Sequence, residues 1–589
     1  MFLCWLYFVL CFAVHPQSPI THGRFIDPDD TLYAVQSAEL LDGQSWYDLT
    51  EHRMDPPKGV NVYYSRLLEL TYAATIGVLT PFVDRANAIF IMAALWPPSF
   101  LLGLLFAVRR QARLLIPKGW AELTALVIIL MQGVLYDFMP GHIDHHGFGA
   151  LLVSLCLGFG LSMIANPSKT RSAAAAGATL ALALSVALES LPWLLTFSAF
   201  IGAWACLKPE RANSALAFGG ALSLVGSILL LTYRAPADLF TIDLTSFSFV
   251  YIILLYGIGL CMAVVWLLRR EPDTPKKVAQ AVIFAATTGT LFLCTFPDLL
   301  FGPYGAVDKE FVDFILPFIK ETTPLVEIQA AMPIVVCFLP WPLLSLAVCA
   351  WQMRINRYRR RQMWLLIGMT LTVATLLALF YEERYMAYAQ LFGAIPLTFL
   401  AWKLMRHASF LRTATLVGVM LIYPVGSEAL FYDKPALDIL LYPMLTYTPP
   451  CDVSAAAHVL ENAPYNAGAP KLILNGINEG MDLLLETRHT VLSAPFHENI
   501  NGNLDALRFF QATDPQTAEE IIRRRGVDFV LLCRKTESIY LYTDPQQASE
   551  TAISRPLAKR LLSNDIPAWL HPIPLDKGSD ILLFQVRSY

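Results

Sequence analysis

The chain has 589 residues, of which 56% are hydrophobic and only 15% carry a charge. Its mean hydropathy of +0.50 excludes an ordinary soluble protein, because a soluble chain of this length carries more charged residues. The net charge of −4 gives no basic surface for a nucleic acid. The composition therefore predicts a membrane protein with no nucleic-acid partner.

The hydrophobic excess is confined to the first part of the chain. Apolar runs stop near Tyr432, and the residues that follow are typical of a soluble protein. We therefore expect two domains, a multi-span membrane domain over residues 1–432 and a soluble α/β domain over residues 433–589. Cys451 and Cys533 are the only cysteines in the soluble part, and they can pair if this part faces an oxidising compartment.

Membrane spans are predicted from apolar runs long enough to cross the hydrocarbon core. The run Met1–Val14 is short for a span, but it lacks the basic residues that open a secretory signal, so we interpret it as the first span. The later runs bring the total to about 13 spans. These later runs are Ala86–Val108, Trp120–Phe138, Gly147–Ile164, Ser172–Leu188, Pro192–Leu207, Ser214–Tyr233, Phe247–Leu268, Val278–Pro297, Glu327–Gln352, Met363–Phe380, Met386–Trp402 and Phe410–Val425.

The distribution of Lys and Arg sets the orientation, because short basic loops stay on the cytoplasmic side. Basic loops alternate with loops that hold Asp, Glu and His, provided that the run Leu67–Val83 does not cross the bilayer. We therefore place Leu67–Val83 in the membrane interface or against other helices. An odd number of spans then makes the C-terminal domain extracytoplasmic, and we expect the protein in a bacterial inner (plasma) membrane, surrounded by membrane lipids.

The first external loop opens with an acidic segment, Phe25-Ile-Asp-Pro-Asp-Asp-Thr-Leu-Tyr-Ala34, which contains Asp27, Asp29 and Asp30. Three carboxylates so close together repel one another unless a cation or a substrate hydroxyl lies among them. The same residues are typical of a helix N-terminus, since Asp followed by Pro caps helices well. The segment alone therefore leaves a catalytic role and a capping role open.

The next external loop contains the second segment of interest, Pro140-Gly-His-Ile-Asp-His-His-Gly-Phe148. Its aspartate and its three histidines offer oxygen and nitrogen ligands that suit Mg²⁺, Mn²⁺ or Zn²⁺. In an extended turn, Asp144 and His146 point the same way while His145 points elsewhere. The segment predicts a metal site at the membrane surface.

Two further charged residues stand at external ends of spans. Glu321 lies at the end of the long loop between Leu299 and Leu325, and Arg384 lies between two apolar runs. An Arg at the membrane rim can bind a diphosphate through two parallel hydrogen bonds. Snorkelling or a local ion pair is the alternative explanation for either residue.

The whole layout resembles the GT-C class of membrane glycosyltransferases, and within it the catalytic subunit of oligosaccharyltransferase. An acidic motif follows the first span, a second motif follows the third, and a Glu and an Arg occupy late external loops. Gly141-His-Ile-Asp-His-His146 resembles the Asp-His-His form of the second motif in archaeal members. Asp27-Pro28 resembles the first motif, whereas Asp29-Asp30-Thr-Leu-Tyr-Ala34 is similar to the Asp-Glu pair before Tyr-Ala in other GT-C families, so the register of the first motif stays open.

The resemblance implies an all-α, GT-C-like membrane domain followed by the small α/β domain. It also implies a divalent cation, Mg²⁺ or Mn²⁺ with Zn²⁺ as a further option, held by Asp27, Asp144, His146 and Glu321. The catalytic candidates are the three acidic residues of the first motif, Asp27, Asp29 and Asp30. Asp27 or Asp30 would act as general base on the acceptor hydroxyl or orient it.

Family members use a sugar linked to a polyprenyl phosphate or diphosphate, so we expect a donor of this kind. Arg384 is the candidate for its phosphate groups, and His142 and His145 are further candidates for substrate binding. The chain lacks the Trp-Trp-Asp-Tyr-Gly signature with which oligosaccharyltransferases recognise the acceptor sequon. The acceptor therefore stays open between a lipid, a polysaccharide and a protein.

The function expected from the sequence is transfer of a sugar or oligosaccharide from this donor at the extracytoplasmic face. The alternative is a flippase or transporter for a lipid-linked sugar or a polysaccharide. Transporters carry polar residues near the bilayer midplane and often contain internal repeats, whereas the notable charges here stand at external span ends. This pattern favours the enzyme.

The soluble part alternates strand and helix patterns. Lys471–Asn475 and Asp528–Cys533 are short apolar runs bounded by Gly and polar residues, so we expect buried strands. Pro515–Arg525 is predicted to be a helix that ends before Gly526. The polar stretch Pro495–Asn503 is predicted to be a surface loop, with contact to substrate or to the membrane domain as the alternative.

Overall fold

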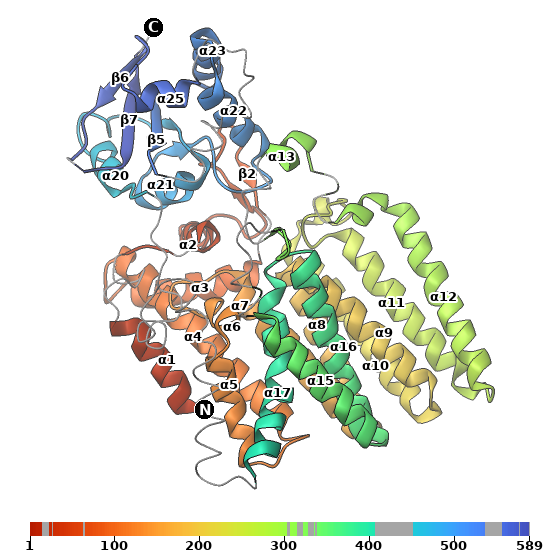
Figure 1. The fold of residues 1–589 in the computed structure, drawn as a ribbon. Helices are drawn as coiled ribbons and strands as arrows, with labels where there is room; N and C mark the ends of the chain where they lie inside the picture. Colours follow the sequence, from red (N-terminus) through yellow and green to blue (C-terminus); the bar gives the residue numbers. More distant parts are fainter. Residues whose placement is uncertain are drawn as a thin grey trace.

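A computed structural model of the chain shows a bundle of helices with a smaller α/β domain at one end (Figure 1). The structure describes residues 1–14, 23–25, 27–62, 65–302, 305, 307–314, 322–327, 335, 338–406, 451–535, 556–576 and 578–587. The predicted domain boundary at residue 432 and the predicted span Phe410–Val425 lie outside these residues.

Six of the described helices are long and apolar enough to cross a membrane. They are α4 (Arg85–Ala112), α7 (His145–Ala165), α10 (Ala212–Tyr233), α11 (Phe249–Leu267), α12 (Thr274–Thr295) and α16 (Tyr358–Phe380). Their charged residues stand at the helix ends, and the middle of each helix is apolar, as a lipid-spanning helix requires. The chain is therefore an integral membrane protein.

Further helices complete the bundle, namely α1 (Phe2–Val14), α5 (Leu123–Ile129), α6 (Gln132–Tyr136), α8 (Thr170–Val186), α9 (Leu191–Cys206), α15 (Pro340–Ile355) and α17 (Tyr385–Met405). The predicted span Trp120–Phe138 is interrupted between α5 and α6. There the backbone N–H of Val134 donates to the side-chain oxygen of Gln390 at 3.3 Å. The helical membrane domain is thus confirmed, whereas the total of about 13 spans stays a prediction.

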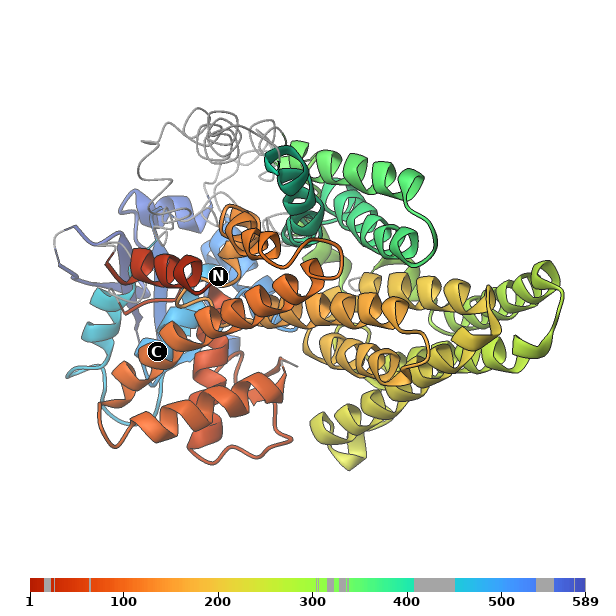
Figure 2. The same ribbon diagram turned by 90° about the horizontal axis from the view of Figure 1, so that it is seen from below.

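Many of the helices that pack together are not consecutive in the chain. Helix α7 contacts α4 and α8, α10 contacts α8 and α11, and α17 packs against α5, α15 and α16. A side chain at Gly177 on α8 would collide with the backbone of Phe218 on α10, so the glycine allows these two helices to approach closely. Seen from the end opposite to the α/β domain, the yellow-green helices α11 and α12 lie farthest from α1 (Figure 2).

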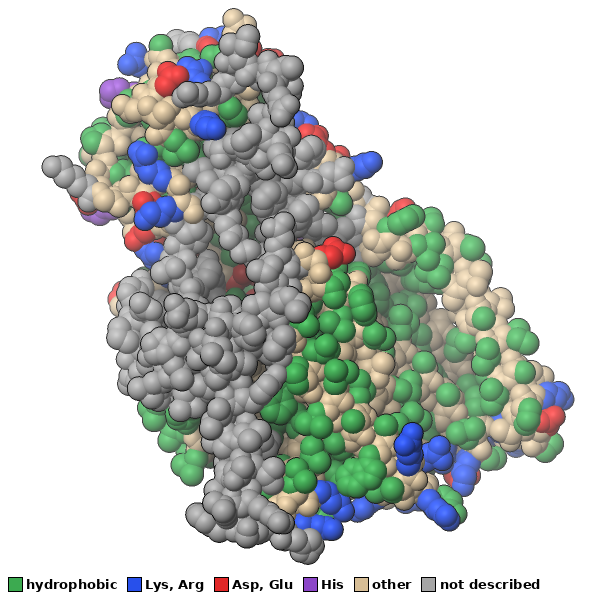
Figure 3. All heavy atoms as spheres, in the orientation of Figure 1, with side chains coloured by type: hydrophobic (Ala, Val, Ile, Leu, Met, Phe, Trp, Pro, Cys, Tyr) green, Lys and Arg blue, Asp and Glu red, His purple; other side chains and the backbone are tan. Residues whose placement is uncertain are grey.

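Lys and Arg side chains collect at the end of the bundle that lies away from the α/β domain (Figure 3). Arg109 and Arg110 end α4, Arg269 and Arg270 follow α11, and Arg354 ends α15. The positive-inside rule requires this arrangement if that end of the bundle is cytoplasmic. The α/β domain and the first turn of α7 are then at the opposite end.

The α/β domain is built on a five-stranded sheet in the order β4-β3-β5-β7-β6. Strand β3 is parallel to β4 and β5, whereas β7 is antiparallel to β5 and β6. The strands are β3 (Leu472–Leu474), β4 (Thr490–Val491), β5 (Phe529–Cys533), β6 (Leu570–Ile573) and β7 (Ile581–Val586). Every residue of β3 and β5 is buried, as the two predicted apolar strands require.

The helices of this domain are α20 (Ser454–Leu460), α21 (Gly480–Glu486), α22 (Ile500–Gln511), α23 (Pro515–Arg525) and α25 (Leu557–Leu562). Helix α23 has the predicted bounds, and Gly526 ends it in the left-handed conformation with φ 68°. A disulfide joins Cys451 to Cys533, whose Cα atoms lie 6.0 Å apart. It ties the end of β5 to the beginning of the described part of this domain.

The prediction of a surface loop over Pro495–Asn503 is wrong in its second half. Helix α22 begins at Ile500, and the side chains of Asn499 and Asn503 are buried. Oδ1 of Asn503 accepts a hydrogen bond from Oγ of Ser493 at 2.9 Å. The polar residues of this stretch therefore stabilise the interior of the domain, because buried polar groups need hydrogen-bond partners.

The loop between α1 and α4, predicted to be external, forms α2 (Pro28–Leu41), the strands β1 (Thr50–Glu51) and β2 (Val60–Asn61), and α3 (Arg66–Leu79). Helix α2 lies between α21 of the α/β domain and the helices of the bundle (Figure 1). Arg525 of α23 pairs with Asp55 of this loop at 2.8 Å and with Asp505 at 2.6 Å. The loop that carries the acidic segment is therefore held against the α/β domain.

Candidate active site

The acidic segment forms the first turn of α2. Asp27 is the N-cap, and its carboxylate accepts a hydrogen bond from the backbone N–H of Asp29 at 2.9 Å. In return, Oδ2 of Asp30 accepts from the backbone N–H of Asp27 at 3.1 Å, which completes a capping box. The capping interpretation of this segment is therefore confirmed for Asp27.

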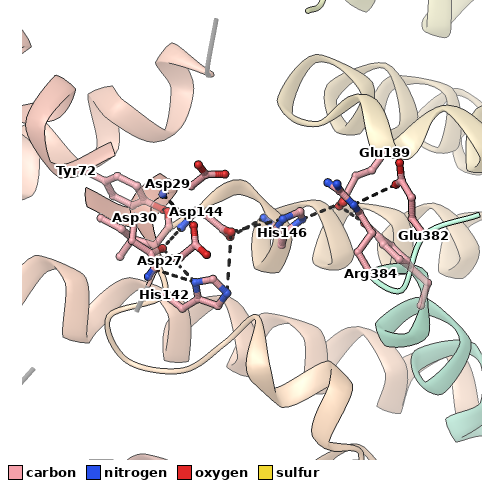
Figure 4. A network of polar contacts seen from close by, with 12 residues as sticks. Asp27, Asp29, Asp30, Tyr72, His142, Asp144, His146, Glu189, Glu382 and Arg384 are labelled. Atoms are coloured by element: carbon pink, nitrogen blue, oxygen red, sulfur yellow. Dashed lines mark hydrogen bonds and ion pairs between the residues drawn. The ribbon is translucent and has the colours of Figure 1, made fainter. Parts of the chain in front are cut away.

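Asp30 also reaches the second predicted motif. Its two carboxylate oxygens lie 3.1 and 3.0 Å from Nδ1 of His142, and Oδ1 accepts from the backbone N–H of Asp144 at 2.9 Å (Figure 4). All three side chains are buried. The two loops that carry the predicted motifs therefore meet through Asp30.

Asp144 is the N-cap of α7, and Oδ1 accepts from the backbone N–H of His146 at 2.9 Å. His145 and His146 thus lie in the first helical turn, and the expected extended turn is wrong, because Asp144 caps a helix at this point. His146 still faces Asp144. Oδ2 of Asp144 lies 3.6 Å from Nε2 of His146 and 4.0 Å from Nε2 of His142.

Glu189, which neither predicted motif includes, also lies beside His146. Glu189 belongs to η3 (Leu188–Ser190), the 3₁₀ turn between α8 and α9, and its Oε2 lies 2.9 Å from Nδ1 of His146. The hydroxyl of Tyr388 donates to Oε1 of Glu189 at 2.8 Å. The sequence signal for Glu189 is a single acid between two apolar spans, which marks a functional candidate in membrane proteins.

Negative charge is concentrated around His142. Burial lowers the pKa of its imidazole, but the carboxylates of Asp30 and Asp144 outweigh this effect and raise the pKa to about 10. For the carboxyl of Asp30, burial has the opposite effect and raises the pKa, and the charge of His142 opposes that shift. The cluster therefore attracts positive charge, either as a proton on His142 or as a metal cation.

The donor atoms fit a divalent cation. Two groups of side chains each bring their candidate ligand atoms within 4.8 Å of one another, namely Asp30, His142 and Asp144, and His145, His146 and Glu189. Ligands bound about 2 Å from one ion lie about 3–3.5 Å apart, and Oδ2 of Asp144 lies 3.6 Å from Nε2 of His146 and 4.0 Å from Nε2 of His142. In the described part of the chain, Nε2 of His142 has no hydrogen-bond partner, although it is buried.

The predicted ligand set is only partly brought together. Asp144 and His146 face each other. Asp27 belongs to neither of the two groups, because its carboxylate caps α2. Glu321 lies outside the described residues. The ring of His145 lies 4.4 Å from that of His146. Arg384 pairs with Glu382 at 3.1 Å and lies next to Glu189 (Figure 4).

The helical membrane domain, with its α/β domain at one end, has the fold of archaeal oligosaccharyltransferase. AglB from Archaeoglobus fulgidus, solved with an inhibitory peptide and a dolichol-phosphate, superposes with a TM-score of 0.72 at 15% sequence identity. The match covers 96% of this chain and 75% of that chain.

Two further structures of the Archaeoglobus fulgidus oligosaccharyltransferase have the same fold. One is tethered to an acceptor peptide containing the sequon NVT, with a TM-score of 0.69, 15% identity, and 88% of this chain and 66% of that chain covered. The other is a complex with Zn and sulfate, with a TM-score of 0.67, 15% identity, and 92% and 69% covered. Neither a family model nor a curated protein sequence matches the chain.

Proposed function

We propose that the protein transfers a sugar or oligosaccharide from a polyprenyl phosphate or diphosphate to an acceptor at the extracytoplasmic face of the membrane. The observation that carries this proposal is the meeting of Asp30, His142, Asp144 and His146 at one end of a bundle with the oligosaccharyltransferase fold. The AglB structure contains a dolichol-phosphate, a polyprenyl phosphate, and this supports a donor of the same chemical class.

The buried cluster is assigned to a divalent cation. Asp144, His146 and His142 would hold it, since Oδ2 of Asp144 faces Nε2 of both histidines. This assignment makes His142 a ligand rather than a substrate contact. When bound, the cation neutralises the charge that develops on the leaving phosphate. Arg384, at the same end of the bundle, is placed to bind a phosphate oxygen of the donor.

The acidic residues divide into two roles. Both oxygens of Asp30 are engaged by His142, Asp144 and Asp27, so Asp30 orients the site. Asp27 and Asp29 are partly exposed and are the remaining candidates for activating an acceptor hydroxyl. Because the Trp-Trp-Asp-Tyr-Gly signature is absent from the sequence, we propose an acceptor other than the protein sequon.

Transfer by the purified protein tests the proposal. The full chain in detergent is incubated with the polyprenyl-linked glycans extracted from the cells that make it, together with their lipid and polysaccharide fractions. Mass spectrometry should detect a new glycosylated product and the released polyprenyl phosphate or diphosphate, and the Asp144→Ala/His146→Ala variant should form neither. Movement of intact lipid-linked glycan across proteoliposomes without any transfer would contradict the proposal and favour a flippase.

A further inference from the structure

Glu189 and Asp144 contact opposite nitrogens of one imidazole. Oε2 of Glu189 lies 2.9 Å from Nδ1 of His146, whereas Nε2 of the same ring lies 3.6 Å from Oδ2 of Asp144. Figure 4 shows the three side chains in a row, with His146 in the middle. Glu189 therefore approaches His146 from the side that faces away from Asp144.

Glu189 is itself held firmly by α17. Oε1 accepts the hydroxyl hydrogen of Tyr388 at 2.8 Å, and the backbone oxygen of Glu189 accepts from the hydroxyl of Tyr385 at 3.3 Å. Its side chain is 5% exposed. A buried carboxylate that is held through one oxygen by Tyr388 has little freedom to turn, so its other oxygen can fix the orientation of the ring that it approaches.

The same arrangement occurs on the other side of Asp144. There Asp30 lies 3.0 Å from Nδ1 of His142, and Nε2 of His142 faces Oδ2 of Asp144. Two carboxylate–histidine pairs thus present Nε2 atoms to one carboxylate oxygen. Histidines that bind metals donate their second N–H to a carboxylate in this manner, and the hydrogen bond sets which ring nitrogen is left to bind the metal.

We propose that Glu189 is a positioning residue of the cation site: it accepts the Nδ1–H of His146 and thereby keeps Nε2 as the metal-binding nitrogen. The inference rests on the proposed function for the role of His146 as a ligand. Tyr388 supports the same role, because it restrains the carboxylate of Glu189. Asp144, His146 and His142 would hold the cation, and Glu189 would act through His146 without being a ligand.

Binding of Mn²⁺ to the full-length protein in detergent tests this role without donor or acceptor. Glu189→Gln removes the charge and keeps the size of the side chain, and it should weaken Mn²⁺ binding about tenfold or more. Glu189→Asp should recover part of the affinity, and Tyr388→Phe should show a smaller loss. Glu122→Gln is the matched control, because Glu122 pairs with Arg109 and Arg113 at the C-terminal end of α4.

Electron spin-echo measurements on bound Mn²⁺ separate positioning from direct ligation. At saturating Mn²⁺, Glu189→Gln should retain the histidine nitrogen couplings and the number of bound waters of the unaltered protein. An additional bound water in Glu189→Gln would make Glu189 a ligand and overturn the inference, as would unaltered affinity. If Glu189→Gln does not fold, Glu189→Asp and Tyr388→Phe decide by the same two readouts. Failure of glycan transfer alone would concern only the proposed function, since Mn²⁺ binding is measured separately.

Discussion

Nδ1 of His142 lies 3.0 Å from Oδ2 of Asp30, although 112 residues separate the two in the chain. Asp30 can reach this position because α2 is held between α21 and the bundle, with Arg525 fastening the same loop to the α/β domain. The cluster is therefore assembled by two separate loops together. The α/β domain contributes to the site by fixing the position of α2.

Replacing Asp30 with Asn should lower glycan transfer about 10–100-fold, the usual effect of losing an outer carboxylate on a metal-binding histidine. An amide can still accept the backbone N–H of Asp144, but it does not carry the charge that orients His142. Transfer rates at fixed Mn²⁺ measure the effect. Asp42→Asn is the control, because Asp42 ends the same helix and pairs with Arg85 at the surface. A wild-type rate for Asp30→Asn would contradict the assigned role.

Replacing Arg525 with Met should loosen the docking of the first external loop. Its guanidinium pairs with Asp55 and Asp505 while its side chain is only 17% exposed, and the loss of such charged hydrogen bonds costs about 1–3 kcal/mol. Limited proteolysis should then cut the segment around Asp55 faster. Arg523→Met should not change the cutting rate, because Arg523 makes an exposed pair with Glu519 on its own helix. Equal cutting rates for both variants would contradict the role of Arg525 in docking this loop.

Reduction of the Cys451–Cys533 disulfide should destabilise the α/β domain. The bond closes a loop with a sequence separation of 82, and removal of a native disulfide costs about 2–5 kcal/mol. The melting midpoint should fall when a reductant is added to the unaltered protein. Cys451→Ser/Cys533→Ser should melt at the lower temperature with or without reductant, whereas Cys294→Ser should respond like the unaltered protein. A midpoint that reductant does not move would show that the bond contributes nothing.

The α/β domain should become less stable as the pH rises through the range in which Glu479 ionises. Burial raises the pKa of this carboxyl from its ordinary value of 4.5 to about 7. Between these values the folded chain keeps a proton that the unfolded chain releases, so stability decreases with rising pH and is lost most fully above pH 7. Glu479→Gln should match the unaltered protein at pH 5 and melt at a higher temperature at pH 8. Parallel melting curves across this range would contradict the shift.

Local sequence patterns predict much of this fold and one part of the site. The strands around Ile473 and Val530 and the helix Pro515–Arg525 follow from apolar runs and a helix-ending Gly, all of which are short-range signals. Asp144 and His146 lie two residues apart, so their proximity is local as well. The break between α5 and α6 has no short-range signal in the sequence. The side chain that stabilises it, Gln390, comes from a helix far along the chain.

The remaining site residues depend on tertiary contacts. The sequence offers Asp27, Asp29 and Asp30 as equal candidates, and only the packing of α2 decides that Asp30 faces His142 while Asp27 caps the helix. Glu189 is an isolated acid in the sequence, and its partner His146 lies on a different helix. Spacing motifs cannot identify such a contact, because it is formed by the packing of the bundle.

The dependence of transfer on a divalent cation held by Asp144 and His146 tests the central claim most directly. Purified protein is treated with EDTA, and transfer from polyprenyl-linked glycan is measured before and after Mn²⁺ or Mg²⁺ is added. The account predicts that transfer stops and that the cation restores it in the unaltered protein, but not in a folded Asp144→Ala/His146→Ala variant. Transfer that persists in EDTA, or full activity of the double variant, would contradict it.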